Sequence, residues 1–216
     1  MVFLLVILLL VGAVFATLHF ENRIHIVVLN AFAKTNPSAA AGSDTAWKAL
    51  SGSLTVGQGS LHLFSAGTNA SAELGQNYAD MAMATHVFLD TGNSISLFGR
   101  FANSDNAVSC RFTRSDIVII GKNNGRETTL AKIQNPLAVT YPLAALGMAV
   151  NGKNIICYEG SKAVVQASDE SIPSYGGVAV AVGGDQSVSL FINSISVVPY
   201  DQALTLFRTF PQYNAQ

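Results

Sequence analysis

The chain has 216 residues, a formal net charge of −1 and a mean hydropathy of +0.37. Charged residues make up only 12% of it, about half the usual share, and no basic run occurs. This composition excludes strong electrostatic capture of nucleic acid, so we expect no nucleic-acid partner and a surface of Ser, Thr, Asn, Gln and Gly.

Residues 1–20 form an apolar stretch without a formally charged side chain, and a polar collar with Glu21 and Arg23 follows. About 20 helical residues span the hydrocarbon core of a bilayer. We therefore predict a transmembrane or signal-anchor helix over residues 1–22. A cleaved signal peptide is the alternative, because Val14-Phe15-Ala16 supplies small residues for a peptidase. Both interpretations place the rest of the chain outside the cytoplasm, at the cell surface.

An apolar helix before a β-rich head is also the outline of type IV pilins, which this chain resembles in that respect alone. Their usual glutamate at the fifth mature position is Leu5 here. The resemblance implies a third interpretation, in which the helix joins copies of the chain into a filament.

From residue 23 onward, short β-rich segments alternate with turn signals such as Asn-Gly and Gly-Gly. About a dozen strands without a convincing internal helix predict an all-β fold of two packed antiparallel sheets over residues 23–200. In residues 201–216, Asp201–Phe210 is predicted to form a short helix that docks through Leu204, Phe207 and Phe210. The expected strands are Arg23–Phe32, two around the Gly57-Gln58-Gly59 turn, Ala79–Leu89, Ser94–Phe101, Ala107–Thr113, Asp116–Lys122, Thr128–Ile133, Ala144–Asn151, Asn154–Glu159, Ala163–Ala167, Gly177–Val182 and Val188–Val198.

Two cysteines, Cys110 and Cys157, both fall in expected strands. We favour buried thiols that act as small hydrophobic residues. A disulfide between them is the alternative, and an extracytoplasmic location would permit it.

The order of several loose motifs resembles the concanavalin A-like jelly-roll superfamily, in its laminin-G-like and keto-glycoside-hydrolase-like branch. The motifs span residues 31–198, and the family's usual Trp before the Asn-Gly hairpin is missing. The resemblance implies a jelly-roll sandwich and is compatible with lectins, adhesion modules and glycosidases alike. The motifs are Asn30-Ala31-Phe32, Trp47, Gly52–Leu61, Tyr78-Ala79-Asp80, Phe98-Gly99-Arg100, Asn151-Gly152, Tyr158, Gly176-Gly177-Val178 and the final strand Val188–Val198.

The chain lacks a recognisable catalytic set. The paired acids of this fold's glycosidases, E-x-D-x-x-E or E-x-D-x-E, do not occur, nor do G-x-S-x-G, H-E-x-x-H or C-x-x-C. We therefore lean against an enzyme. A glycoside-processing hydrolase stays possible only if acids from separate strands, such as Asp80 and Glu159, meet. His62 and His86 are interpreted as strand residues with local hydrogen bonds.

The candidate ligand-binding residues are Arg100, Arg111 and Asp80. Because alternate strand residues share a face, Val108, Cys110 and Phe112 should point inward, which leaves Arg111 outside. Arg100 is expected on the same outer face of the neighbouring strand, beside Ser94 and Ser96. Two arginine forks could then bind a sugar or a carboxylate. The alternative is solvated arginines paired with Asp80 or Glu159.

Members of the family that the chain resembles commonly bind calcium through oxygen ligands from loops at the edge of the sandwich. Four weak candidates lie in turns, where Asp and Asn also occur for conformational reasons alone, so we predict no cofactor. The candidates are Asp90, Asn93, Asp105 and Asp185.

These observations predict a membrane-anchored, extracytoplasmic jelly-roll module that binds carbohydrate or another surface ligand and performs no chemistry. The first alternative is a structural subunit, a homo-oligomer that forms a filament or envelope layer through the apolar helix. The second is the glycoside-processing hydrolase.

Overall fold

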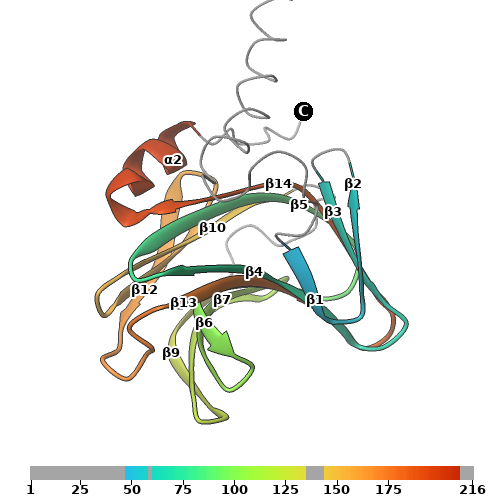
Figure 1. The fold of residues 1–216 in the computed structure, drawn as a ribbon, viewed down its shortest axis with the longest axis horizontal. Coiled ribbons are helices and arrows are strands. Elements are labelled where there is room, and N and C mark those ends of the chain that lie inside the picture. Colours follow the sequence, from blue (N-terminus) through green and yellow to red (C-terminus); the bar gives the residue numbers. More distant parts are fainter. Residues whose placement is uncertain (1–46, 58–59, 135–143, 210–216) are drawn as a thin grey trace, which may run out of the picture. The chain divides into compact units, whose positions relative to one another are not determined.

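In the computed structural model, residues 47–57, 60–134 and 144–209 are described, and their strands form two antiparallel sheets packed face to face (Figure 1). Each sheet has seven strands. The all-β, two-sheet sandwich predicted from the sequence is confirmed. The predicted anchor helix, residues 1–22, and the predicted strand Arg23–Phe32 lie outside the described residues.

One sheet, here called the front sheet, has the order β1-β4-β13-β6-β7-β8-β9. Long connections bring β13 between β4 and β6, as in jelly rolls. Its strands are β1 (Trp47–Ser51), β4 (Asn69–Tyr78), β13 (Gly176–Gly183), β6 (Ser94–Asn103), β7 (Asn106–Thr113), β8 (Asp116–Asn123) and β9 (Arg126–Gln134).

The other sheet, here called the back sheet, has the order β12-β11-β10-β5-β14-β3-β2. A long connection likewise brings β14 between β5 and β3. Its strands are β12 (Lys162–Ser168), β11 (Asn154–Glu159), β10 (Ala144–Asn151), β5 (Met81–Thr91), β14 (Val188–Pro199), β3 (Ser60–Ser65) and β2 (Ser53–Gly57).

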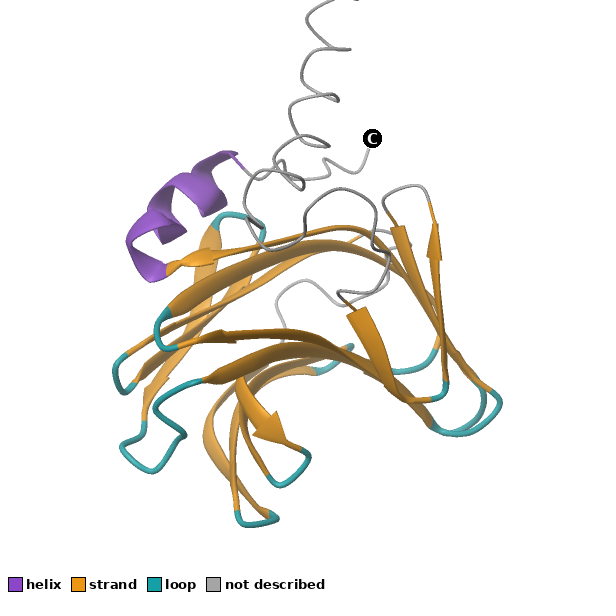
Figure 2. Cartoon of the chain, viewed as in Figure 1, coloured by secondary structure: helices purple, strands orange, loops and turns teal. Residues whose placement is uncertain are grey.

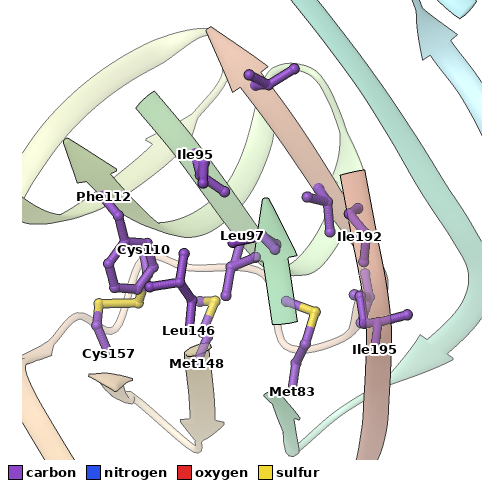
Figure 3. Close-up of a cluster of buried hydrophobic side chains, with 14 of the residues drawn as sticks. Met83, Ile95, Leu97, Cys110, Phe112, Leu146, Met148, Cys157, Ile192 and Ile195 are labelled. Carbon is purple, nitrogen blue, oxygen red and sulfur yellow. A yellow bond between two sulfur atoms is a disulfide. The ribbon is translucent and has the colours of Figure 1, made fainter. Parts of the chain in front are cut away.

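The core lies between the sheets and is built by the period-two alternation of each strand. In β7, Val108, Cys110 and Phe112 are buried, as predicted. They pack with side chains such as Leu97 and Met148 in one cluster that both sheets contribute to (Figure 3).

Cys110 of β7 and Cys157 of β11 form a disulfide that joins the two sheets through the core (Figure 3). Our preference for two free thiols is wrong. The alternation that buries both cysteines also aims them at each other across the sandwich, with 5.7 Å between their Cα atoms.

After β14, a 3₁₀ turn (Tyr200–Gln202) leads into α2 (Ala203–Thr209), drawn in purple in Figure 2. The predicted helix is therefore present. Phe207 docks as expected, but the docking of Leu204 is wrong, because Ala203 and Phe207 are the buried residues and Leu204 is 70% exposed. Phe210 lies outside the described residues. Within the described ranges, no helix is long and apolar enough to cross a membrane.

Both sheets bend in the same direction, so that the outer face of the front sheet lies on the inner side of the bend (Figures 1 and 2). Its central strands β13, β6 and β7 therefore present a curved surface on the side away from the core.

Candidate functional site

Arg111 of β7 lies on the outer face of the front sheet, as predicted, because its neighbours Cys110 and Phe112 point into the core. The register places Ser96 of β6 directly opposite Arg111, and Phe98 directly opposite Ser109. We call Ser96, Phe98, Ser109 and Arg111 the central patch.

Two hydroxyls of the central patch, those of Ser96 and Ser109, have no hydrogen-bond partner among the described residues. Both serines are buried, at 8% and 4% exposure, yet neither hydroxyl is sealed from solvent. On the other neighbouring strand, the residue opposite each serine is apolar: Ala181 of β13 is opposite Ser96, and Ile120 of β8 is opposite Ser109. Since buried polar groups are normally hydrogen-bonded, these two hydroxyls are open to a ligand.

The charge of Arg111 is only loosely matched. Its nearest carboxylate is that of Glu127 on β9, with 3.7 Å between Nη2 and Oε2, whereas charge-assisted hydrogen bonds measure about 2.7–2.9 Å. Both side chains are partly exposed, at 40% and 51%. The guanidinium of Arg111 therefore keeps most of its donors available.

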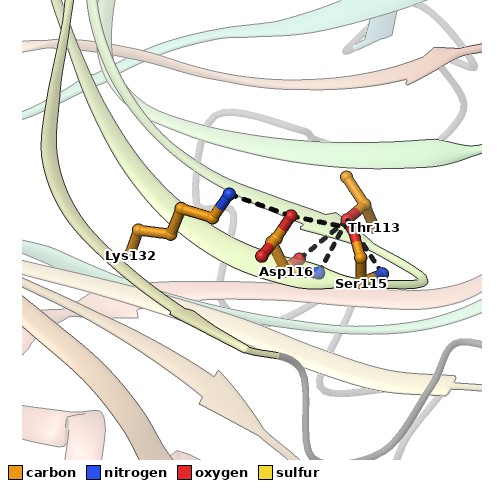
Figure 4. A network of polar contacts seen from close by, with 4 residues as sticks. All are labelled: Thr113, Ser115, Asp116 and Lys132. Atoms are coloured by element: carbon orange, nitrogen blue, oxygen red, sulfur yellow. Dashed lines mark hydrogen bonds and ion pairs between the residues drawn. The ribbon is translucent and has the colours of Figure 1, made fainter.

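Lys132 of β9, by contrast, is closely paired. Its ammonium lies 3.1 Å from a carboxylate oxygen of Asp116 (Figure 4). The hydroxyl of Ser115 donates to the same oxygen, at 2.7 Å. The hydrogen bond from Ser115 makes the larger contribution and the contact with Lys132 the smaller one, and together they lower the pKa of Asp116 and keep it ionised. Lys132 is thus occupied within the protein.

Phe98 supplies the aromatic part of the central patch. It faces outward because the next residue faces inward: a Cβ on Gly99 would meet Val150 and Met81 of the back sheet. Phe98 lies edge to face with Phe101, with 5.8 Å between the ring centroids. Both rings are half-buried, so the patch combines an apolar surface with hydroxyls and a cation.

Arg100 does not join this surface, and its predicted place beside Ser94 and Ser96 is wrong. Its φ of 48° breaks the alternation of β6, and the residue is 4% exposed. Its guanidinium donates to the carbonyl oxygens of Ala79 and Pro173 and to Oδ1 of Asp80.

Asp80 lies in the β4–β5 connection, directly before β5, and links two loops. Its Oδ1 pairs with Arg100 at 2.7 Å and accepts the backbone N–H of Gly152 at 2.8 Å. The Arg100–Asp80 pairing that we gave as the alternative is therefore present, although Arg100 is buried rather than solvated. Of the three predicted ligand-binding residues, two form this internal pair, and Arg111 alone lies on the open face.

The four calcium candidates do not converge. Asn93 donates through its side-chain amide to Asp185, at 3.2 Å, whereas Asp105 lies in the β6–β7 turn near Lys122. Among the described residues, no group of three or more His, Cys, Asp or Glu side chains is placed to hold a metal ion.

The two acids considered for hydrolysis lie far apart along the back sheet. Met81, next to Asp80, pairs with Val150 of β10, whereas Glu159 pairs with Leu146. Four residues of strand correspond to about 13 Å, beyond the separation of about 5–9.5 Å that glycosidases need.

The two described histidines have local hydrogen bonds, as predicted. His62 bonds Ser189 at 3.0 Å and stacks on Phe191, and His86 bonds Ser194 at 2.8 Å.

Sequence reasoning missed Phe98 as a surface residue and Glu127 as the partner of Arg111. Alternation in β6 could have identified Phe98, since it shares a face with Ser96. Nothing local could have identified Glu127, because β9 is placed by the pairing of three strands.

The sequence matches no known protein family and no curated protein. Its fold is similar to the carbohydrate-binding module CBM66 from Bacillus subtilis, with a TM-score of 0.60 and 17% identity over 71% of this chain and 95% of that one. The exoplasmic/lumenal domain of VIP36 in its Ca²⁺- and Man3GlcNAc-bound form gives a TM-score of 0.57 and 14% identity, over 71% of this chain and 84% of that one. A glycosidic hydrolase gives a TM-score of 0.58 and 10% identity, over 73% of this chain and 91% of that one. At these identities the likeness defines the class of fold alone, a two-sheet antiparallel β-sandwich of the jelly-roll type.

Proposed function

We propose that the protein is a non-catalytic carbohydrate-binding module and that the central patch is its binding surface. The observation that carries the proposal is a pair of hydroxyls, those of Ser96 and Ser109, that have no hydrogen-bond partner in the described part of the chain and lie beside an aromatic ring and an open guanidinium. Sugars present hydroxyls on one edge and apolar C–H groups on their faces, so a few placed polar groups beside an aromatic side chain suit them.

The similar folds support this proposal, because a carbohydrate-binding module and the exoplasmic/lumenal domain of VIP36 in a Man3GlcNAc-bound form are among them. The hydrolase among them supports the alternative function. The separation of Asp80 and Glu159 favours binding over hydrolysis.

We further propose that residues 1–20 anchor the module in a membrane and that it acts outside the cytoplasm. The apolar length of that segment supports the first point. The Cys110–Cys157 disulfide supports the second, because disulfides persist mainly in oxidising compartments.

A glycan array probed with the full-length chain tests the function. We expect binding to at least one glycan class and a loss of about thirtyfold in affinity for the Ser96→Ala/Ser109→Ala double variant, since each of the two lost hydrogen bonds costs about 1 kcal/mol. Ser104→Ala, in an exposed turn, is the matched control and should bind normally. If no glycan binds, or if both variants bind like the wild type, the proposal is wrong.

A further inference from the structure

Arg111 is the charged group of the central patch, and its surroundings leave that charge nearly unmatched. Its contact to Glu127 is long, at 3.7 Å, and half exposed. Lys132, the neighbouring cation on this face, is already held by Asp116 at 3.1 Å. A ligand that meets the central patch therefore meets one open guanidinium.

The residues directly opposite Arg111 on the two neighbouring strands are neutral. Ser96 lies opposite Arg111 on β6, and Val118 lies opposite it on β8. Ser109 is two residues away on β7, about 7 Å along the strand. In such surroundings, a hydrogen bond between a guanidinium and a carboxylate is stronger than in open water.

The shape of the donor set also points to a carboxylate. The guanidinium is a planar fork that bonds both oxygens of a carboxylate at once. Ser96 is directly across the strand pair, at about 5 Å between Cβ atoms. One fork and two hydroxyls therefore lie within reach of one sugar residue that carries a carboxylate next to its ring hydroxyls.

We propose that the ligand is an acidic saccharide containing uronate residues and that Arg111 binds the uronate carboxylate. This inference rests on the proposed function and adds the ligand class. Ser96 and Ser109 bind ring hydroxyls of the same residue, and Phe98 contacts its apolar face. Glu127 competes with the ligand for the guanidinium.

The test compares two polymers that differ in one group. The full-length chain is titrated with polygalacturonate and with the same polymer after reduction of its carboxyl groups to galactan, by affinity electrophoresis or calorimetry. Alginate serves as a second uronate polymer of different stereochemistry. Polyglutamate serves as a polyanion without sugar.

We expect at least one uronate polymer to bind at least tenfold more tightly than both the reduced polymer and polyglutamate. Arg111→Gln should weaken that binding about tenfold to a hundredfold, the range for a charged hydrogen bond. Arg126→Gln, which removes an exposed arginine of β9, is the matched control and should change nothing. Glu127→Gln should strengthen uronate binding several-fold, because it removes the competing carboxylate.

Three results would overturn the inference: neither uronate polymer binds more tightly than the reduced polymer, neither binds more tightly than polyglutamate, or uronate binding is unchanged in Arg111→Gln. The proposed function survives each of these if the array identifies a neutral glycan whose binding depends on Ser96 and Ser109. Absence of binding to every glycan would instead overturn both proposals. Thermal unfolding of each variant shows that the fold is intact, which we expect because Arg111 is partly exposed and its ion pair is long.

Discussion

A single backbone exception explains why Arg100 and Arg111, which the sequence grouped together, have different roles. A non-glycine residue with positive φ is uncommon, and at Arg100 this conformation turns the side chain away from the outer face. Gly176 makes the arrangement possible, since a Cβ there would lie 2.5 Å from the carbonyl carbon of Arg100. The alternation of strand residues therefore predicted the outer-face position of Arg111 correctly and gave the wrong position for Arg100.

The internal role of Arg100 leads to a stability prediction. Arg100→Ala should lower the free energy of unfolding by about 3 kcal/mol, because it removes the buried guanidinium that pairs with the half-exposed Asp80 and leaves the carbonyls of Ala79 and Pro173 without their donor. Urea denaturation measures the loss. Arg114→Ala, at an exposed turn, should lie within about 0.5 kcal/mol of the wild type. A loss below 1 kcal/mol for Arg100→Ala would refute the structural role.

Glu159 gives a prediction about pH. It shares the inner face of β11 with Cys157, and its Oε2 is buried without a hydrogen-bond partner. Burial raises the pKa of Glu159, although Lys162 partly opposes the shift. The fold therefore favours the neutral acid. The stability that the fold gains from the neutral form of Glu159 is fully present below the pKa that this carboxyl has in the unfolded chain. It is lost as the pH rises through the higher pKa that the carboxyl has in the folded chain.

Glu159→Gln should accordingly be more stable than the wild type at pH 8 and equally stable at pH 4. Solvent screening of this partly exposed group limits the gain to about 1 kcal/mol, or about 2–4 °C in Tm. Thermal melts at both pH values measure it. Glu170→Gln, at a carboxyl whose side chain is 82% exposed, is the control. A gain of equal size at both pH values would contradict the assignment to ionisation.

At the scale of elements, residue composition decides which strands the sequence reveals. Strand β7 alternates large apolar and polar residues and was predicted almost to its ends. The sequence analysis did not predict strand β4, because its inward residues include the small Ala70 and Ala72 and its C-terminal half contains Gly75 and Asn77. These residues have low strand propensity, so only the pairing with β1 and β13 stabilises this strand.

Helix α2 covers part of the back sheet through one aromatic contact. Phe207 stacks on Tyr158, with 3.8 Å between the ring centroids, and a Cβ on Gly147 would lie 2.5 Å from its ring. The apolar patterning of the segment predicted the helix but not the face that docks. Gly147 leaves room for the ring of Phe207, and Leu204 points to solvent.

Phe207→Ala should therefore lower the free energy of unfolding by about 3 kcal/mol, as large-to-small substitutions at buried aromatic positions do. Leu204→Ala, three residues away on the same helix, should cost less than about 0.5 kcal/mol. Chemical denaturation of the two variants gives the comparison. Equal losses would mean that α2 docks through another face.

At the scale of the whole molecule, the central patch depends on strand order, which local sequence does not encode. Adjacent strands β6 and β7 are joined by a short turn, so their pairing was predictable. Strand β13 reaches its place beside β6 from more than 70 residues further along the chain. The neighbours that make Ser96 a buried residue, Ala181 among them, are set by that long-range pairing.

The two sheets are also joined covalently, and this joint gives the last prediction. The Cys110–Cys157 disulfide closes a loop with a sequence separation of 47 residues, for which the chain-entropy relation gives about 4 kcal/mol of stabilisation. The Cys110→Ala/Cys157→Ala double variant should lose about 2–4 kcal/mol in urea denaturation. Reducing agent should destabilise the wild type by a similar amount and leave the double variant unchanged.

The double variant should still bind the ligand of the wild type at urea concentrations below its lower unfolding midpoint, because the disulfide points into the core and the central patch lies on the opposite face of β7. Insensitivity of the wild type to reductant would show that the two thiols are not bonded and would remove the support that the disulfide gives to an extracytoplasmic location.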